Sequence, residues 1–296
     1  MKLLLLGKSG QVGWELQRSL APLGELVALD QKSTEFHADF SQPERLAATI
    51  AAIRPDVIVN AAAHTAVDKA ESQPELARQI NAMAPGVLAS AAAGIGALMV
   101  HYSTDYVFDG RGERPWRETD ATGPLSVYGR TKLEGEQLVA RHCPRHLIFR
   151  TSWVYAARGG NFAKTMLRLA TERDKLTVIN DQFGAPTGAE LLADVTAHVI
   201  RETLREPGKA GLYHLAAAGE TTWHGYARYV LTRAQAMGVE LKAAPEAVEP
   251  VPTSAFPTPA MRPYNSRLDT SKLRTTFELV LPPWEDGVDR MLRETL

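Results

Sequence analysis

The first half of the chain alternates short apolar runs with stretches whose apolar residues recur at helical spacing. The apolar runs predict β-strands at Lys2–Leu6, Glu25–Leu29, Asp56–Asn60, Leu98–Ser103 and His146–Arg150. The helical patterns between them lie at Gln11–Leu20, Pro43–Ile53, Lys69–Ala93 and Val127–Arg141. Val57-Ile58-Val59 is apolar at every position, as expected of a parallel strand that helices cover on both faces. This order predicts an α/β fold with a doubly wound parallel sheet.

The pattern changes after Arg150. Helical segments at Ala163–Glu172, Ala189–Leu204 and Trp223–Met237 now mix with short strands at Leu176–Ile179 and Leu212–Leu215. Residues 245–263 are rich in proline, and a stretch of this length without structure is usually functional or flexible. We therefore expect a first domain over residues 1–150. Residues 151–296 should form a smaller mixed α/β lobe over the carboxyl edge of the sheet, with some elements returning to the first domain.

Composition excludes several classes of protein. The chain is 45% hydrophobic and 23% charged, which is ordinary for a globular protein. A net charge of −1 offers no basic surface for nucleic acid or anionic lipid. The single cysteine, Cys143, excludes an intramolecular disulfide and fits a reducing compartment. The apolar run Leu3–Leu6 is too short for a signal peptide or a membrane span, so we expect a cytoplasmic protein.

A glycine-rich turn follows the first predicted strand and opens the first predicted helix. Its glycines let the backbone turn tightly and approach a pyrophosphate, which the N-terminus of the helix then attracts. This position between strand and helix predicts a Rossmann-type site for a dinucleotide. The predicted contacts are Gly7, Gly10, Gln11, Val12 and Gly13. Gly7-Lys8-Ser9 also resembles the end of a P-loop, but that motif needs a glycine where Lys2 stands.

Residues after the next strands predict the rest of the cofactor site. Asp30 ends the second strand, where a carboxylate binds ribose hydroxyls and favours NAD(H) over NADP(H). Lys32 follows closely and could offset the repulsion of a 2′-phosphate, so use of both NADH and NADPH is plausible. Asp39 and Phe40, after a predicted short strand, could hold the adenine. Ala61-Ala62-Ala63 would let the backbone lie against the cofactor, although small residues serve tight packing equally well.

Tyr128 and Lys132 lie four residues apart on a predicted helix and therefore share a face. A free tyrosine has a pKa near 10. An ammonium and an oxidised nicotinamide beside it would bring that pKa closer to neutrality, because both positive charges favour the phenolate. Tyr128 could then exchange a proton with a carbonyl oxygen. The strand ending in Ser103-Thr104 brings a hydroxyl that can hydrogen-bond the same oxygen. Together with the glycine turn, this set predicts a nicotinamide-dependent oxidoreductase.

At these residues the chain resembles the extended short-chain dehydrogenases/reductases, and among them the enzymes that reduce keto sugar nucleotides. The resemblance covers essentially the whole chain. The segments that carry it are Gly7–Gly13, Val59–Asp68, Tyr102–Phe108, Tyr128–Lys132, Arg150–Tyr155, Asp181–Thr187 and Arg262–Ser266.

The resemblance implies reduction of the 4-keto group of dTDP-4-dehydro-β-L-rhamnose by NADH or NADPH, the last step in the synthesis of dTDP-β-L-rhamnose. It implies that Tyr128 donates the proton, that Lys132 holds the nicotinamide ribose, and that Thr104 polarises the ketone. Further cofactor contacts implied by the resemblance are His64, Thr65 and Tyr102. The implied sugar contacts are Val67, Asp105, Tyr106 and Trp153, with Asn161, Phe162 and Arg262 toward the nucleotide end.

The resemblance also implies a homodimer with a structural magnesium ion, for which the matching residues are Glu15, Glu190 and Glu294. Isolated glutamates on helix surfaces more often face water. Asn81 matches a position where related enzymes use an asparagine, although a structural asparagine bonded to backbone fits as well. His101 is expected to be a packed strand residue.

Other functions stay open, and one is the reduction of another 4-keto sugar nucleotide by an enzyme of the same fold. A sugar-nucleotide 4,6-dehydratase resembles the chain around Ser103–Asp105 but needs a glutamate where Tyr106 stands, to remove a proton. An epimerase is compatible with Tyr128 and Lys132. A non-catalytic regulatory subunit of methionine adenosyltransferase resembles this family too, but an intact tyrosine, lysine and threonine set argues against it.

Overall fold

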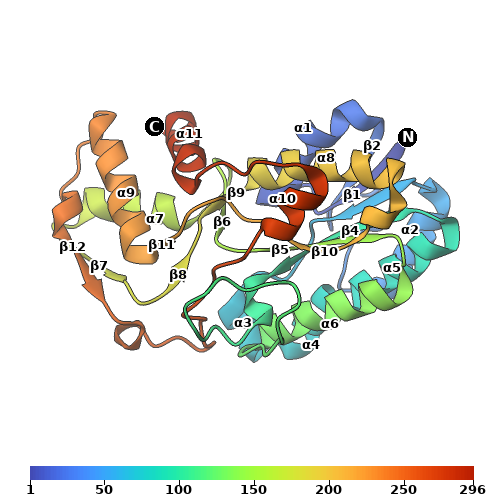
Figure 1. Ribbon diagram of the computed structural model, residues 1–296, viewed down its shortest axis with the longest axis horizontal. Coiled ribbons are helices and arrows are strands. Elements are labelled where there is room, and N and C mark those ends of the chain that lie inside the picture. Colours follow the sequence, from blue (N-terminus) through green and yellow to red (C-terminus); the bar gives the residue numbers. More distant parts are fainter.

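A computed structural model describes residues 1–296 and shows two unequal parts, of which the larger is built on a six-stranded sheet (Figure 1). All strand pairs of this sheet are parallel, and their order is β10-β5-β4-β3-β1-β2. The strands are β1 (Lys2–Leu6), β2 (Glu25–Leu29), β3 (Val57–Asn60), β4 (Leu98–Thr104), β5 (His146–Thr151) and β10 (Gly211–His214). The predicted doubly wound α/β fold is confirmed.

Helices cover both faces of the sheet, which explains why its strands are apolar throughout. Leu3 and Leu5 of β1 pack with α1 (Gln11–Leu20) and α8 (Ala189–Arg205). Leu4 and Leu6 point to the opposite face, against α2 (Leu46–Ile53), α5 (Ala84–Ile95) and α6 (Val127–His142). Strand β10 and helices α8 and α10 (Ser271–Phe277) come from residues beyond 151 and nevertheless complete the sheet and its cover.

The prediction of a single helix over Lys69–Ala93 is wrong, because the chain forms several short helices there. They are α3 (Val67–Ser72), α4 (Pro74–Arg78), the π-helical turn η3 (Gln79–Met83) and α5. Pro74 forces the break: the residue before a proline avoids helical angles, and Gln73 has φ −133° and ψ 54°. The π turn places Asn81 next to α6, beside the catalytic candidates.

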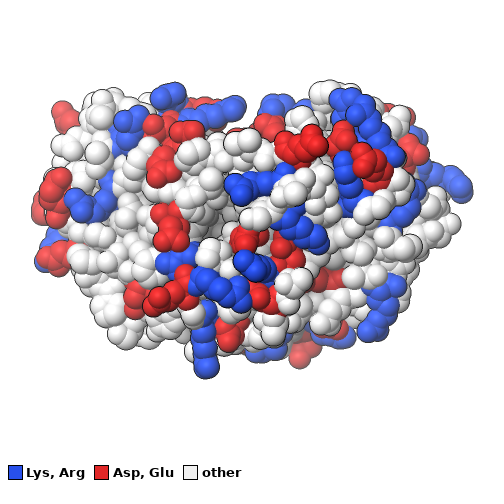
Figure 2. All heavy atoms as spheres, viewed as in Figure 1, with Lys and Arg blue, Asp and Glu red and all other residues white.

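The smaller part contains α7 (Phe162–Glu172), α9 (Trp223–Ala236) and α11 (Trp284–Thr295), on the left of Figure 1. Its short strands are β6 (Val154–Tyr155), β7 (Leu176–Ile179), β8 (Phe183–Gly184), β9 (Thr187–Gly188), β11 (Thr221–Thr222) and β12 (Val248–Val251). No helix of the protein combines the length and the apolar character that a membrane span requires. Figure 2 shows acidic and basic side chains interspersed over one face, without a broad area of either sign.

The proline-rich residues 245–263 are not a structureless loop. They include the 3-10 turns Pro245–Ala247 and Thr253–Ala255 and strand β12, which pairs with β7 in parallel. Pro250 is tolerated because β12 is an edge strand of a two-stranded sheet, where a missing N–H leaves no ladder partner unpaired. Residues 252–264 then lead back from the smaller part to α3 of the larger one (Figure 1).

Candidate active site

The glycine turn after β1 has the geometry that a dinucleotide phosphate needs. Gly7 has φ +92°, and a Cβ on it would lie 2.7 Å from the Ala62 nitrogen. A Cβ on Gly13 would lie 1.9 Å from the Gly7 oxygen, so both positions require glycine. A Cβ on Gly10 would meet only an ordinary contact at 3.5 Å, which leaves its outer side free for a ligand. Helix α1 starts at this turn with no capping side chain and no acidic residue in its first turn. The turn therefore fits a pyrophosphate.

Asp30 lies beside this turn at the end of β2. Its carboxylate accepts hydrogen bonds from the Ser9 hydroxyl and, at 2.9 Å, from the Lys32 nitrogen. The Ser9 hydrogen bond is the largest of the effects that together lower the pKa of Asp30. A negative charge is thus fixed where the adenosine ribose would lie, and Lys32 is directly beside it.

Asp39 and Phe40 do not follow a strand, because residues 31–42 form turns and bends. The Asp39 carboxylate accepts hydrogen bonds from the nitrogen and the hydroxyl of Ser41, at 2.9 and 2.8 Å. Phe40 is 5% exposed and packs in the core with Leu4 and Leu29. Its apolar character serves the core, which leaves little of the ring to face an adenine.

The residues after β3 are held by two buried asparagines. The Asn60 side chain accepts a hydrogen bond from the Ala62 nitrogen at 3.0 Å and contacts His101 Nδ1 at 3.1 Å. The Asn81 side chain bonds with both backbone groups of His64. The His64 nitrogen donates to Asn81 Oδ1 at 2.8 Å, and Asn81 Nδ2 donates to the His64 carbonyl at 3.1 Å. Asn81 is therefore bonded to backbone in this structure, and the Ala61–His64 backbone has a fixed course next to Gly7. His101 is a packed strand residue, as expected, with 1% exposure.

Tyr128 lies in the first turn of α6, which begins close to the end of β4. Ser126 caps the helix by accepting a hydrogen bond from the Gly129 nitrogen at 3.1 Å. A Cβ on Gly129 would lie 2.2 Å from the Tyr106 oxygen, so glycine is what allows this close approach. Burial raises the pKa of Tyr128 to about 12, against a smaller opposing effect of a hydrogen bond with Thr104. In the protein alone, the phenol is thus harder to ionise than free tyrosine, contrary to the direction expected with a bound oxidised cofactor.

Lys132 is 2% exposed, and its ammonium donates a hydrogen bond of 2.5 Å to the Tyr102 carbonyl. Burial lowers the pKa of Lys132 to about 8, and Glu136 partly opposes that shift. The Tyr102 side chain points the other way, into the core beneath α8, where its hydroxyl lies 2.6 Å from Thr196 Oγ1. Side chains of a strand alternate between its two faces, and that of Tyr102 falls on the face covered by α8. Tyr102 therefore contacts Lys132 through its carbonyl and not through its ring.

Thr104, Asp105 and Tyr106 turn off the end of β4 toward Tyr128. The Thr104 hydroxyl donates to Asp105 Oδ1 at 3.0 Å and accepts from the Tyr106 nitrogen at 3.2 Å. Asp105 is 2% exposed, and burial raises its pKa to about 6. The Tyr106 ring packs edge-on against Tyr128 with 5.5 Å between centroids. The structure therefore brings these four predicted residues together.

Trp153 has a backbone conformation that is rare for a non-glycine residue, with φ 50°. Such strained residues cluster at functional sites. Its ring stacks on Trp223 with 3.7 Å between centroids. A Cβ on Gly184 would lie 2.7 Å from Trp153 Cε2, so this glycine makes room for the indole.

Three weaker predictions lie farther out. Asn161 caps α7 by accepting a hydrogen bond from the Lys164 nitrogen at 3.0 Å, and Phe162 packs on Trp223. Both therefore have structural partners. Arg262 forms an ion pair of 2.7 Å with Asp68 at the start of α3. Thr65 is exposed and Val67 half-buried, both at the entry to α3.

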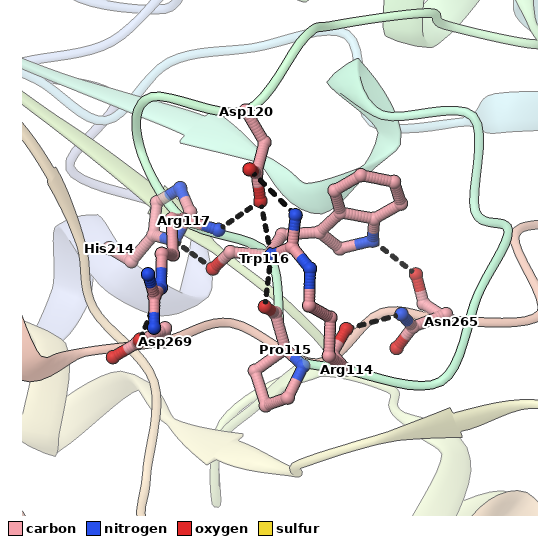
Figure 3. Close-up of polar contacts among 8 residues, drawn as sticks. All are labelled: Arg114, Pro115, Trp116, Arg117, Asp120, His214, Asn265 and Asp269. Carbon is pink, nitrogen blue, oxygen red and sulfur yellow. Dashed lines mark hydrogen bonds and ion pairs between the residues drawn. The ribbon is translucent and has the colours of Figure 1, made fainter.

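A set of contacts that sequence reasoning missed holds the segment between Asp109 and α6 (Figure 3). Trp116 Nε1 donates to the Asn265 carbonyl at 3.1 Å, and Asn265 Nδ2 donates to the Arg114 carbonyl at 2.8 Å. Asn265 is 1% exposed and lies about 150 residues away in the sequence from both partners. No local pattern links them; only the match at Arg262–Ser266 pointed to this segment.

The predicted metal ligands Glu15, Glu190 and Glu294 form no metal cluster in the single chain. Glu15 contacts Arg18 at 3.6 Å and Glu294 contacts Arg290 at 3.0 Å. Burial raises the pKa of Glu190, and the charges of Glu15 and Glu294 add to this. No three His, Cys, Asp or Glu side chains of the chain are grouped closely enough to hold a metal ion.

A parallel sheet with a glycine turn at its first strand, and a Tyr/Lys pair on the helix beside β4, define a nicotinamide oxidoreductase of the extended short-chain class. The family model described as "RmlD substrate binding domain" matches residues 1–296. The chain belongs to this family.

Similar proteins carry a common name. A dTDP-4-dehydrorhamnose reductase of Salmonella typhimurium is 64% identical over 294 residues, which cover 99% of this chain and 98% of that protein. The crystal structure of a dTDP-4-dehydrorhamnose reductase from Clostridium acetobutylicum matches with a TM-score of 0.88 and 35% identity over 99% of both chains. A reductase of the same name from Bacillus anthracis, solved in complex with NADP, matches with a TM-score of 0.88 and 34% identity, again over 99% of both chains.

Proposed function

We propose that this protein reduces the 4-keto group of dTDP-4-dehydro-β-L-rhamnose to give dTDP-β-L-rhamnose, with NADH or NADPH as the reductant. The observation that carries the proposal is that Tyr128, Lys132 and Thr104 lie around the end of β4, at the same edge of the sheet as a glycine turn that fits a dinucleotide. The identity of 64% to a reductase of this name over nearly the whole chain supports the choice of substrate.

The cofactor would lie along the carboxyl edge of the sheet. Gly7–Gly13 and the start of α1 would hold its pyrophosphate, Asp30 its adenosine ribose, and Lys132 the ribose of the nicotinamide. When bound, the reduced nicotinamide supplies the hydride for the carbonyl carbon of the substrate. We assign residues 1–150 mainly to the cofactor and residues 151–296 mainly to the substrate, with β10 and α8 belonging to the first part.

Tyr128 would donate the proton to the oxygen of the ketone. A pKa of about 12 keeps its phenol protonated at physiological pH, as a donor must be before the reaction. The ammonium of Lys132 then stabilises the phenolate that the transfer leaves behind.

Thr104 would hydrogen-bond the same ketone oxygen, but in this structure its proton is given to Asp105. Presenting the proton to the ketone requires only a rotation of the hydroxyl about the Cβ–Oγ1 bond of Thr104. Asp105, Tyr106, Val67 and Trp153 would then surround the sugar. Arg262 would have to leave Asp68 to reach the diphosphate, for which a guanidinium is well suited.

The test is an assay of NADH and NADPH oxidation with a panel of 4-keto sugar nucleotides. We expect one NAD(P)H consumed for each molecule of the 4-keto-6-deoxy sugar nucleotide reduced. A dehydratase or an epimerase would recycle its cofactor without net oxidation. That outcome would exclude the proposal.

Two further parts of the proposal concern assembly. A homodimer and a magnesium ion bound by Glu15, Glu190 and Glu294 remain predictions. Burial raises the pKa of Glu190, and the nearby charges of Glu15 and Glu294 add to the shift, which supports a site shared by the three carboxylates. Light scattering with and without Mg²⁺, on the natural chain and on Glu190→Gln, tests both. A monomer whose light scattering does not change with Mg²⁺ would exclude them.

A cytoplasmic location also remains a prediction, supported by the free, buried Cys143.

A further inference from the structure

The most deeply buried ion pair of the protein lies under the catalytic helix and has no part in the chemistry described above. Arg150 Nε donates to Glu136 Oε1 at 2.9 Å, and Arg150 Nη2 donates to Glu136 Oε2 at 2.7 Å. The two side chains are 4% and 5% exposed. Taking both charges out of water is costly, and a pair of this kind is weak evidence of a stabilising role. Its position indicates another role.

Glu136 follows Lys132 by four residues on α6, so the two side chains are neighbours on the same helix face. Arg150 is on β5 and lies opposite Ser103 of β4, the residue after Tyr102. The ion pair is therefore one helical turn from Lys132, on the side that faces the sheet. Lys132 itself is held from the same sheet by the Tyr102 carbonyl.

Glu136 is the carboxylate whose charge raises the pKa of Lys132, against the lowering by burial. On α6 there is Tyr128, whose phenol is neutral, and on β4 there is His101, whose pKa burial holds well below its usual range. Helix α5 and the π turn η3, both packed on α6, contain no charged residue. The remaining carboxylates on the elements packed on α6 lie elsewhere: Asp68 pairs with Arg262, Glu71 accepts from the Val127 nitrogen, Glu75 is exposed, Asp105 contacts Thr104, and Glu134 pairs with Arg78.

We propose that Glu136 and Arg150 are positioning residues for the reaction: the Glu136 carboxylate is the fixed counter-charge of the Lys132 ammonium, and Arg150 holds that carboxylate in place. A free carboxylate one turn away could pair directly with Lys132 and draw it from Tyr102 and from the ribose. The two-point contact with Arg150 prevents this and still leaves the negative charge close by. The inference rests on the role proposed above for Lys132.

The experiment measures the pH dependence of NADH binding and of kcat/KM. In Glu136→Gln the ammonium loses its counter-charge, so Lys132 should lose its proton at a lower pH. We expect the alkaline limb of both profiles to move down by about one pH unit or more. At pH 6.5, where Lys132 is still protonated, binding should stay within about threefold of the natural enzyme, since 0.65 kcal/mol corresponds to that factor.

Control variants separate positioning from folding. Glu136→Asp keeps the charge and should restore the profile toward that of the natural enzyme. Glu134→Gln removes a carboxylate of the same helix that is also held by an arginine, Arg78, but on the exposed side, and should leave the profile unchanged. Because Glu136→Gln leaves Arg150 buried and unpaired, the double variant Glu136→Leu/Arg150→Met keeps the test valid if the single variant fails to fold.

The double variant should show a smaller shift in the same direction, because it removes a positive charge together with the negative one. A folded Glu136→Gln or double variant with an unchanged alkaline limb would overturn the proposal and make the pair purely structural. NADH binding needs no sugar nucleotide. A wrong substrate would therefore abolish the kcat/KM profile but not the binding profile, and the two failures can be told apart.

Discussion

The cofactor side and the sugar side of the site are built in opposite ways. The turn Gly7–Gly13 is one continuous segment, and its fit to a pyrophosphate depends on backbone geometry that three glycines permit. The proposed sugar side draws on the end of β4, Trp153 and the segment Arg262–Asp269. Contacts with residues far away in the sequence hold that segment: Asn265 bonds with Arg114 and Trp116, and Arg262 pairs with Asp68. The first side therefore depends mainly on the backbone geometry of one turn, whereas the second depends on contacts between distant residues. Substitutions in the two should have different signatures.

The largest effect is expected where the two sides meet, at Tyr128. Tyr128→Phe removes the proposed proton donor and keeps the ring that packs against Tyr106. We expect kcat to fall by about 10²–10⁴-fold with little change in the affinity for NADH, because a general acid contributes on that scale. Steady-state kinetics and NADH titration check both. Undiminished turnover would mean that another group gives the proton.

The next largest effect is expected on the cofactor side, from Gly13→Ala. The added Cβ would lie 1.9 Å from the backbone oxygen of Gly7, so the turn must open. We expect NADH affinity to fall by at least about tenfold, a cost of about 1.4 kcal/mol, and the melting temperature to fall as well. Gly94→Ala is the matched control, since nothing lies within 4 Å of its Cβ in helix α5. That control should stabilise the protein by about 0.4–1 kcal/mol. Normal NADH binding by Gly13→Ala would show that the turn is not the phosphate site.

On the cofactor side the sequence alone predicts the glycine turn and its place between β1 and α1, where the structure has it. The strand, the turn and the helix are contiguous, so apolar pattern and glycine spacing carry the information. The same reasoning proposed Thr104 from the end of a strand and Tyr128 and Lys132 from their spacing on the next helix. Their catalytic roles stay predictions. For Phe40 nothing in the sequence shows whether the ring faces a ligand or the core, and the structure packs it in the core. For Tyr102 the sequence did not show that the ring points into the core while the carbonyl accepts from Lys132.

On the sugar side the sequence was less informative. The left-handed conformation of Trp153 depends on the space that Gly184 leaves and on stacking against Trp223, and none of these residues is close to another in the sequence. Asn265 binds residues about 150 positions away. The break at Gln73 could have been predicted from Pro74, but the π turn that presents Asn81 could not. Long-range packing decides such features, and a single sequence does not display it.

Asn265→Ala should affect the sugar side selectively. It leaves the Arg114 carbonyl without its side-chain donor; the cost should lie at or below the low end of about 1–3 kcal/mol, because this hydrogen bond is only partly buried. We expect KM for the sugar nucleotide to rise several-fold while the affinity for NADH stays the same. Thermal denaturation should confirm the loss of stability. Equal losses of sugar and cofactor binding would mean that the two sides are not built independently.

The smallest effect is expected at the Asp68–Arg262 ion pair, which is partly exposed and therefore contributes little to stability. Asp68→Asn would free Arg262 for the diphosphate proposed to bind there. KM for the sugar nucleotide should then fall by about two- to threefold, with an unchanged melting temperature, as expected for a competing partner worth less than about 1 kcal/mol. Arg262→Met should raise KM instead, because the diphosphate loses its cation. If KM changed in the same direction in both variants, the intact ion pair, and not a released Arg262, would be what the sugar nucleotide requires.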